Sequence, residues 1–236
     1  MNSEHFQDTT QDSVNQIIMN LSQSILQDLT QHEIVKLSKK CKLISFNCND
    51  ILYTQGQEDL NPIILLTGLV KLASNVAQGR ECILHIIRPN AFIDLGVLWY
   101  EAGAPYNAIA IDNGKGLLFD KMQFLEIVET NVNFANKVLK TLVPRQRLFM
   151  HKISSSHGRI SVSCRVSGWL LHRSKMDLSD LLHLDINREL LARLLGVTRE
   201  SLCRELSRLQ SLGYIAVTRK TIQLLNKTAL LKLATR

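Results

Sequence analysis

The chain has 236 residues, of which 45% are hydrophobic, and a formal net charge of +7. This length is sufficient for two domains with separate hydrophobic cores, and no apolar run reaches the ~18 residues that a membrane span needs. The positive charge is concentrated at one end, because residues 158–236 carry a net charge of +8 and residues 1–157 carry −1. Such segregation is typical of a nucleic-acid-binding domain joined to a domain of another kind.

The first 13 residues are polar, and we expect them to be disordered. They have neither the basic nor the apolar region of a secretory signal, so we expect a cytoplasmic location. Two amphipathic helices are predicted to follow, over Val14–Leu29 and Gln31–Lys40, the second of them capped by Thr30.

Between Leu43 and Phe119 the hydrophobic period shortens to that of β-strands. Short apolar runs alternate with turn signals such as Gly56, Gly68 and Gly79, which predicts a small β-barrel or roll. With the preceding helices this region forms the expected effector domain of residues 14–120. Its strand candidates are residues 42–46, 50–55, 63–74, 81–87, 107–112 and 115–120.

The cysteines do not indicate a structural or catalytic site. They are odd in number and scattered, which favours reduced thiols over a disulfide framework or a zinc ribbon. Cys82 and His85 lie three residues apart on a predicted strand, so simple alternation directs them to opposite faces and disfavours a Cys–His nucleophile pair. No phosphate-binding loop or other catalytic motif is present, and we expect no enzyme activity. The cysteines are Cys41, Cys48, Cys82, Cys164 and Cys203.

A helical period returns over residues 121–156. Apolar residues recur there at spacings of four and seven, which suits a dimerisation helix that packs against a symmetry mate; packing against its own β-roll is the alternative. Pro144 is predicted to kink this helix, and Ser154–Gly158 is predicted to form a hinge before a DNA-binding domain of residues 157–236. The apolar stripe consists of Ile127, Phe134, Val138, Leu142, Phe149 and Ile153.

The C-terminal domain is predicted to begin with a helix over Arg159–Ser174. Residues 187–225 then predict a helix, a tight turn, a second helix and a two-stranded wing. Asn187 is positioned to cap the first helix, Gly196 to end it with a positive φ, and Thr198 to cap the second helix. This succession is typical of a winged helix-turn-helix that binds DNA.

The segments TRESLCR, ELSRLQSLGYI and KTIQLL resemble the recognition helix and wing of the cyclic AMP receptor protein and FNR (CRP/FNR) superfamily. The resemblance extends, with less specific motifs, from about Lys42. It implies an α+β fold with an N-terminal β-roll sensor, cupin-like and similar to cyclic-nucleotide-binding domains, a long dimerisation helix and a C-terminal winged helix-turn-helix. It also implies a homodimeric bacterial transcription regulator, with DNA and RNA polymerase as partners.

Three polar residues of the predicted recognition helix are the candidates for reading bases. Arginine can bind a guanine edge with two hydrogen bonds, and glutamate can accept one from the cytosine amino group. Arg199, Glu200 and Arg204 match the family positions that read a TGTGA-type half-site, which predicts an inverted repeat with half-site centres about 34 Å apart. A non-specific architectural DNA-binding protein is the alternative of another class. The candidates for phosphate contacts are Arg188, Ser201 and Lys220.

The cyclic-nucleotide site of the family pairs a glutamate that binds ribose with an Arg-Ser pair that binds phosphate. In the matching segment, residues 91–110, Asp94 takes the place of the glutamate, and Tyr106 and Asn107 take the places of the Arg-Ser pair. We expect no cation nearby, and an unpaired buried phosphate would be costly. The sequence therefore predicts an effector other than cyclic AMP or cyclic GMP.

Two other effector classes remain open. Haem would make the chain a gas or nitrosative-stress sensor, with His85 as the candidate axial ligand. A small uncharged or aromatic ligand would need an apolar cavity lined by aromatic residues, which alternatively just fill the barrel. An iron–sulfur cluster of the FNR type is not expected, because residues 1–40 contain no cysteine. The aromatic residues are Phe92, Trp99, Tyr100 and Tyr106.

Overall fold

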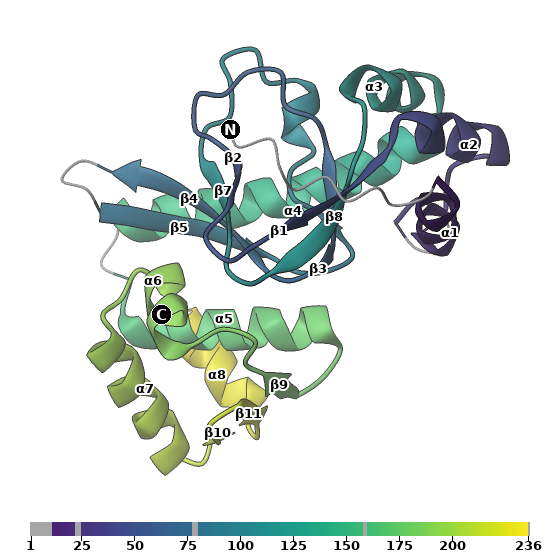
Figure 1. The fold of residues 1–236 in the computed structure, drawn as a ribbon. Helices are drawn as coiled ribbons and strands as arrows, with labels where there is room; N and C mark the ends of the chain where they lie inside the picture. Colours follow the sequence, from purple (N-terminus) through teal and green to yellow (C-terminus); the bar gives the residue numbers. More distant parts are fainter. Residues whose placement is uncertain (1–10, 22–24, 77–79, 158–159, 236) are drawn as a thin grey trace. The chain divides into compact units, whose positions relative to one another are not determined.

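The computed structural model describes residues 11–21, 25–76, 80–157 and 160–235 (Figure 1). The chain divides into an N-terminal unit of residues 1–149 and a C-terminal unit of residues 150–236. Among the described residues, no helix is long and apolar enough to cross a membrane. Most of the tail expected to be disordered, residues 1–13, lies outside the described residues, although its residues 11–13 are helical.

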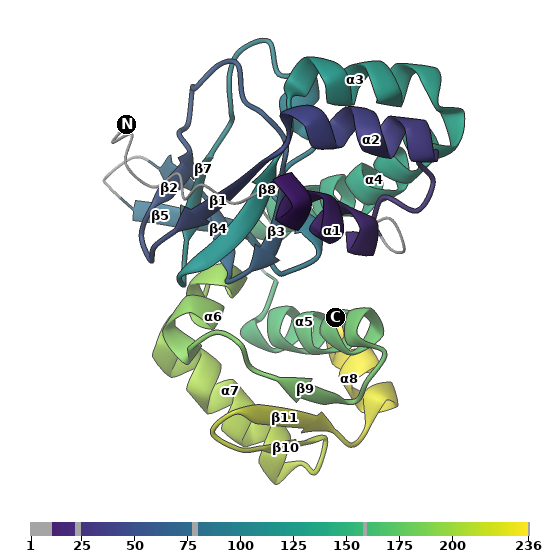
Figure 2. The same ribbon diagram turned by 45° about the vertical axis from the view of Figure 1, so that its right-hand side comes forward.

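Three helices, α1, α2 and α3, lie side by side in the N-terminal unit (Figure 2). Helix α1 starts earlier than predicted and ends at Leu21 instead of Leu29. Helix α2 has its predicted bounds, because Thr30 and Glu33 form a capping box. The Thr30 hydroxyl accepts a hydrogen bond from Glu33 N at 3.3 Å, and the Glu33 carboxylate accepts one from Thr30 N at 2.7 Å. The bounds are α1 Gln11–Leu21, α2 Gln31–Lys40 and α3 Lys121–Thr130.

The predicted β-roll is confirmed as two antiparallel four-stranded sheets. The strand orders are β1-β8-β3-β6 in one sheet and β2-β7-β4-β5 in the other. Gly68 divides the predicted apolar run of residues 63–74 into two strands: its φ is +83°, and a Cβ there would lie 2.9 Å from the Asn113 carbonyl oxygen. The bounds are β1 Lys42–Phe46, β2 Ile51–Tyr53, β3 Ile63–Thr67, β4 Val70–Val76, β5 Arg80–Ile87, β6 Ala91–Phe92, β7 Asn107–Ala110 and β8 Gly114–Leu118.

An irregularity in β5 corrects the predicted directions of its side chains. The register between β4 and β5 skips Leu84, which leaves Cys82 opposite Ser74 and His85 opposite Leu72. Ser74 and Leu72 are two residues apart on β4 and share a face, so Cys82 and His85 also share a face. The prediction of opposite faces was wrong, because it assumed unbroken alternation.

The sheet β1-β8-β3-β6 has a hydrophobic core on each face. Ile64 of β3 faces the core beneath the helices, whereas Ile63 and Leu65 face the core between the two sheets. Phe124 of α3 holds the centre of the helical core and makes edge-to-face contacts with three other rings at centroid distances of 5.5, 5.6 and 5.5 Å. The three rings are those of Phe92, Phe119 and Phe134.

The segment 121–156, predicted as one helix kinked at Pro144, consists of two helices that meet at Asn131. Asn131 ends α3, and its side-chain oxygen accepts a hydrogen bond from Phe134 N at 3.0 Å, which caps the next helix. That helix, α4, spans Val132–His157 and contains Pro144 in its interior. The predicted hinge is helical over residues 154–157, and Gly158 lies outside the described residues.

Helix α4 presents a different apolar stripe to solvent from the one predicted. Phe134 and Val138 of the predicted stripe are buried in the unit's own helical core. Four other apolar residues recur at spacings of seven, four and seven, and they are 56–72% exposed. At 100° per residue these four fall on one line along the helix. They are Val132, Leu139, Val143 and Met150.

The C-terminal unit contains the predicted helix-turn-helix and wing, with additions. Its first helix begins at Val162 after the N-cap Ser161, and Arg159 lies outside the described residues. The wing has a third strand, β9, in the order β10-β11-β9, and a further helix, α8, follows it. The bounds are α5 Val162–Asp177, β9 Leu181–His183, α6 Arg188–Leu195, α7 Arg199–Ser211, β10 Ile215–Val217, β11 Thr221–Leu224 and α8 Lys227–Ala234.

Candidate DNA-reading surface and sensor site

The three residues that the sequence indicated set the ends of α6 and the start of α7. The Asn187 side chain accepts a hydrogen bond from Leu190 N at 2.8 Å, which starts α6. Gly196 ends α6 with a φ of +65°, a left-handed conformation that favours glycine. The Thr198 hydroxyl accepts a hydrogen bond from Ser201 N at 3.2 Å, which starts α7.

Helix α7 has a buried face and an exposed polar flank. Leu202, Leu206 and Leu209 are at most 2% exposed, and they fix the orientation of the helix. The three candidate base-reading residues, Arg199, Glu200 and Arg204, are all exposed in the first two turns. Glu200 also lies in the first turn, where the helix dipole favours a negative charge.

The candidate phosphate contacts come from α6, α7 and the wing. Arg188 begins α6 and is half-buried, with its Nη1 3.9 Å from the Cys203 sulfur. The Ser201 hydroxyl contacts the Thr198 hydroxyl at 2.9 Å, so it already takes part in the cap of α7. Lys220 is exposed in the turn of the wing.

Two residues that sequence reasoning missed hold this surface in place. Arg165 of α5 donates hydrogen bonds to the carbonyl oxygens of Leu195 and Gly196, at 3.2 and 3.3 Å, and so supports the turn before α7. The Gln210 side chain accepts a hydrogen bond from Val217 N at 3.0 Å and joins α7 to the wing. Their roles depend on contacts between elements, for which the sequence carried no local signal.

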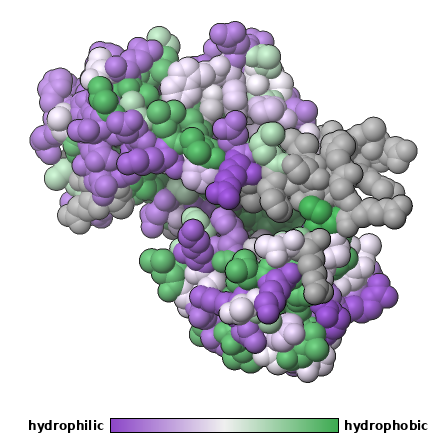
Figure 3. Space-filling model, turned by 180° about the vertical axis from the view of Figure 1, so that it is seen from behind, coloured by the Kyte–Doolittle hydropathy of each residue, from purple (hydrophilic) through white to green (hydrophobic). Residues whose placement is uncertain are grey.

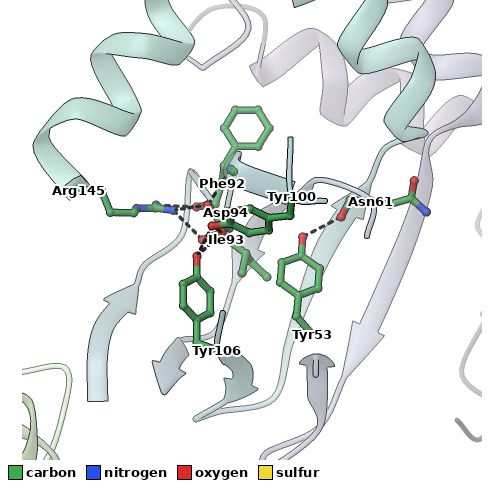
Figure 4. A network of polar contacts seen from close by, with 9 residues as sticks. Tyr53, Asn61, Phe92, Ile93, Asp94, Tyr100, Tyr106 and Arg145 are labelled. Carbon is green, nitrogen blue, oxygen red and sulfur yellow. Dashed lines mark hydrogen bonds and ion pairs between the residues drawn. The ribbon is translucent and has the colours of Figure 1, made fainter. Parts of the chain in front are cut away.

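In the N-terminal unit, Asp94 is the centre of a buried polar cluster (Figure 4). The Tyr100 hydroxyl donates a hydrogen bond to Asp94 Oδ2 at 2.7 Å, and the Tyr106 hydroxyl donates one to the same oxygen. The main-chain N–H of Gly96 donates to Oδ1 at 2.9 Å. The carboxylate is 3% exposed, and these donors compensate for its lost hydration.

The guanidinium of Arg145, on α4, completes the cluster and corrects the prediction that no cation lies near this segment. Arg145 Nη1 lies 3.6 Å from Asp94 Oδ1. The same side chain donates hydrogen bonds to the carbonyl oxygens of Ile93 at 2.9 Å and Phe92 at 3.0 Å. Arg145 is far from Asp94 in the sequence, and no motif pointed to it.

The two tyrosines of the cluster are held as hydrogen-bond donors. Burial raises the pKa of the Tyr106 and Tyr100 hydroxyls, and the negative charge of Asp94 raises the pKa of each further. Tyr53, also buried, donates its hydroxyl hydrogen bond elsewhere, to the Asn61 carbonyl oxygen at 2.8 Å. The cluster therefore consists of one acceptor carboxylate surrounded by donors (Figure 4).

The other predicted effector residues do not join the cluster. Trp99 is 48% exposed, and Phe92 packs in the helical core instead of facing Tyr106. The Asn107 side chain accepts a hydrogen bond from Gln55 N at 2.8 Å. His85 is partly buried on β5. The structure thus brings together Asp94, Tyr100 and Tyr106, but it does not gather the predicted aromatic residues around one cavity.

Comparison with known proteins gives two family matches. A family model of the cyclic nucleotide-binding domain matches residues 43–131, and one of the Crp-like helix-turn-helix domain matches residues 164–233. No curated protein matches the chain.

On the face seen in Figure 3, hydrophilic and hydrophobic residues are interspersed.

Solved structures share the fold at low sequence identity. FixK2 from Bradyrhizobium japonicum is 21% identical, with a TM-score of 0.70 over 82% of this chain and 96% of its own. A CooA mutant from Carboxydothermus hydrogenoformans is 19% identical, with a TM-score of 0.71 over 97% of both chains. The c-di-GMP-responsive regulator CLP of Xanthomonas campestris is 18% identical, with a TM-score of 0.63 over 83% of this chain and 99% of its own.

Proposed function

The chain belongs to the CRP/FNR superfamily, whose members are transcription regulators and not enzymes, and we propose that it reads a TGTGA-type inverted repeat as a homodimer. The observation that carries this proposal is the exposed flank of Arg199, Glu200 and Arg204 at the start of α7. Since the opposite face of α7 is anchored by buried leucines, this flank is the side that can enter a major groove. DNA and RNA polymerase are the proposed partners, in the cytoplasm.

Base reading and backbone binding fall to different residues in this proposal. The two arginines of the flank bind guanine edges, and Glu200 accepts a hydrogen bond from a cytosine amino group. Phosphate contacts position the protein without specifying sequence. They are assigned to Arg188, Ser201 and Lys220.

The substitution Arg199→Ala tests this assignment. It is expected to weaken binding to the palindrome by ~1–3 kcal/mol and to relax discrimination at one G·C pair. The measurement is competition between palindromic and random duplexes at rising salt concentration. Lys232→Ala is the control, because it removes a positive charge from α8 in the same unit. Equal affinity of the wild-type chain for both duplexes would instead support an architectural DNA-binding protein.

The exposed stripe on α4 is the proposed dimer interface. Val132, Leu139, Val143 and Met150 follow the a and d spacing of a two-stranded coiled coil. Pairing two such helices about a two-fold axis would remove these side chains from water. The predicted dimer is thus retained, but with a different set of apolar residues from the one that the sequence suggested.

Leu139→Asp tests the interface, because a charge at the centre of a paired stripe would be buried without a partner. We expect a monomer in sedimentation velocity. Met122→Asp is the matched control: Met122 is an exposed apolar residue on α3, at 69% exposure, outside the stripe. A dimer that survives Leu139→Asp would contradict the assignment.

The proposed effector is not a cyclic nucleotide, and the reason differs from the one that the sequence suggested. A cation is present, but Arg145 already contacts Asp94 and two carbonyl oxygens. A phosphate entering here would meet the Asp94 carboxylate, and like charges in a buried site repel strongly. The same argument applies to the c-di-GMP named for the Xanthomonas regulator. Haem, with His85 as axial ligand, and a small aromatic ligand remain the alternatives.

Thermal unfolding against a ligand panel tests the effector class. A ligand at 100 times its dissociation constant adds ~2.7 kcal/mol if it binds only the folded state. The panel is haem, cyclic AMP, c-di-GMP and chlorinated phenols. Stabilisation by a cyclic nucleotide would contradict the proposal, whereas stabilisation by haem that His85→Ala abolishes would identify the gas-sensor class.

A further inference from the structure

We infer that the contact between Arg145 and Asp94 is a latch through which the β-roll sets the position of α4 in the dimer. Arg145 is the positioning residue of this latch, and a ligand that competes for Asp94 releases it. The inference rests on the proposed function, since it names the regulation of the proposed dimeric regulator.

Arg145 ties α4 to one short segment of the β-roll. Its three acceptors, the carbonyls of Phe92 and Ile93 and the carboxylate of Asp94, are consecutive in the chain. The Arg145 side chain is only 11% exposed, so little water can replace these acceptors. Helix α4 therefore cannot rotate or slide at this point unless the contact breaks or the segment moves with it.

The latch and the proposed dimer interface lie on opposite sides of the same turn of α4. Val143 belongs to the exposed stripe, and Arg145 follows it by two residues, which corresponds to 200° around a helix. Arg145 thus shares the inward side of the helix with Phe134 and Val138. A movement of α4 that alters the contact at Arg145 also alters the packing of Val143 against the partner.

Pro144, between these two residues, makes this turn easier to deform. Proline has no N–H to donate to the Lys140 carbonyl, and its ring crowds the preceding turn. Sharp bends in helices concentrate at such positions. The sensor contact and the dimer contact therefore meet where α4 resists bending least.

At its other end, the latch depends on the two tyrosines. Tyr100 and Tyr106 both donate to Asp94 Oδ2, whereas Arg145 Nη1 lies 3.6 Å from Oδ1. The two tyrosine hydroxyls lie 3.3 Å apart. Tyr100 is only partly buried. The recognised group is an acceptor carboxylate, so the competing ligand is a hydrogen-bond donor without negative charge. Such a ligand shifts α4 only if it binds the released arrangement better than the latched one.

Arg145→Gln in the full-length protein tests the latch, with Arg147→Gln as the matched control. Arg147 is exposed, two residues further along α4. We expect Arg145→Gln to change the affinity for the TGTGA palindrome by about fivefold or more, with unchanged affinity for random duplex. Hydrogen exchange should rise about tenfold both in α4 around residue 145 and in residues 92–100. The control should change neither quantity.

Tyr106→Phe provides a second variant that preserves the packing. It removes one hydrogen bond to Asp94, and we expect it to shift palindrome affinity and exchange in the same direction by a smaller factor. Should Arg145→Gln fail to fold, this variant decides the question alone.

The outcomes separate the latch from the function on which it rests. A wild-type chain without preference for the palindrome refutes the proposed function, and the exchange measurement then still tests the mechanical coupling. A wild-type chain with that preference, together with folded variants that bind and exchange as it does, overturns the latch. Faster exchange in residues 92–100 alone, with α4 unchanged, also overturns it.

Discussion

The cluster around Asp94 and the exposed flank of α7 are both groups of polar and charged residues, but they differ in how their polar atoms are used. Around Asp94, the carboxylate is 3% exposed and accepts hydrogen bonds from several donors of the same chain. On α7, Arg199, Glu200 and Arg204 are exposed and project from a helix whose other face is buried. The polar atoms around Asp94 form their hydrogen bonds within the chain and so stabilise the fold. The exposed side chains of α7 can instead bind another molecule.

The largest expected effect is the loss of stability that follows from removing Asp94 from its cluster. Asp94→Ala leaves the charge of Arg145 buried without its counter-ion and removes the acceptor of two tyrosine hydroxyls, so we expect a loss of about 3–5 kcal/mol in the free energy of unfolding. Chemical denaturation measures it. Asp112→Ala, at an exposed position of the same unit, should change stability by less than about 0.5 kcal/mol. Equal effects of the two substitutions would show that the buried Asp94 carboxylate contributes no more to stability than an exposed one.

Substitutions among the exposed residues assigned to DNA should change DNA affinity and not stability. Lys220→Ala is expected to weaken binding by a similar factor on every duplex and to reduce the slope of log affinity against log salt by about 1. Titrations of palindromic and random duplexes at several salt concentrations measure both quantities. A loss confined to the palindrome would show that Lys220 reads bases, contrary to its assignment.

Substitution of the residue that caps α7 should have a smaller effect, on both stability and DNA binding. Thr198→Ala removes the hydroxyl that accepts a hydrogen bond from Ser201 N and contacts the Ser201 hydroxyl. Loss of such a cap costs about 1 kcal/mol, and it should also weaken palindrome binding because α7 begins there. Thermal unfolding and DNA titration measure the two effects. Thr228→Ala, on the exposed side of α8, is the control and should alter neither.

The sequence predicted the helix-turn-helix better than the Asp94 cluster, because the helix-turn-helix depends on local signals. Asn187, Gly196 and Thr198 act within one turn of their own position, so their roles follow from neighbouring residues. Arg145 could not be found in this way, since it reaches Asp94 only through the packing of α4 on the β-roll. The third strand of the wing, β9, was not predicted, because its pairing with β11 is also non-local.

The stripe of α4 illustrates a different limit. Two sets of apolar residues recur on this helix at spacings of four and seven, and both satisfy the helical period. Phe134 and Val138 belong to the set that packs internally, whereas Leu139 and Val143 belong to the exposed set. Periodicity identifies an apolar face but not what covers it, so only the tertiary structure could separate the two.

In its burial, Glu33 lies between the buried Asp94 and the exposed residues of α7, because its carboxylate is partly buried. It accepts hydrogen bonds from Thr30 N at 2.7 Å and from the Asn131 side chain at 3.0 and 3.2 Å, and so joins α2 to the junction of α3 and α4. Burial alone would raise the pKa of Glu33, but these hydrogen bonds outweigh it and lower the pKa below the ordinary value of 4.5.

A lowered pKa means that the folded state favours the ionised carboxylate. Its stabilisation is therefore present above pH 4.5 and is lost as the pH falls through the lowered folded-state value. We expect Glu33→Gln to cost about 0.5–1 kcal/mol at neutral pH, and the difference from wild type to shrink in acid. Denaturation across this range measures it, with Glu129→Gln on α3 as the control. If the difference in the free energy of unfolding between wild type and Glu33→Gln stays constant with pH, Glu33 contributes through its shape and not through its charge.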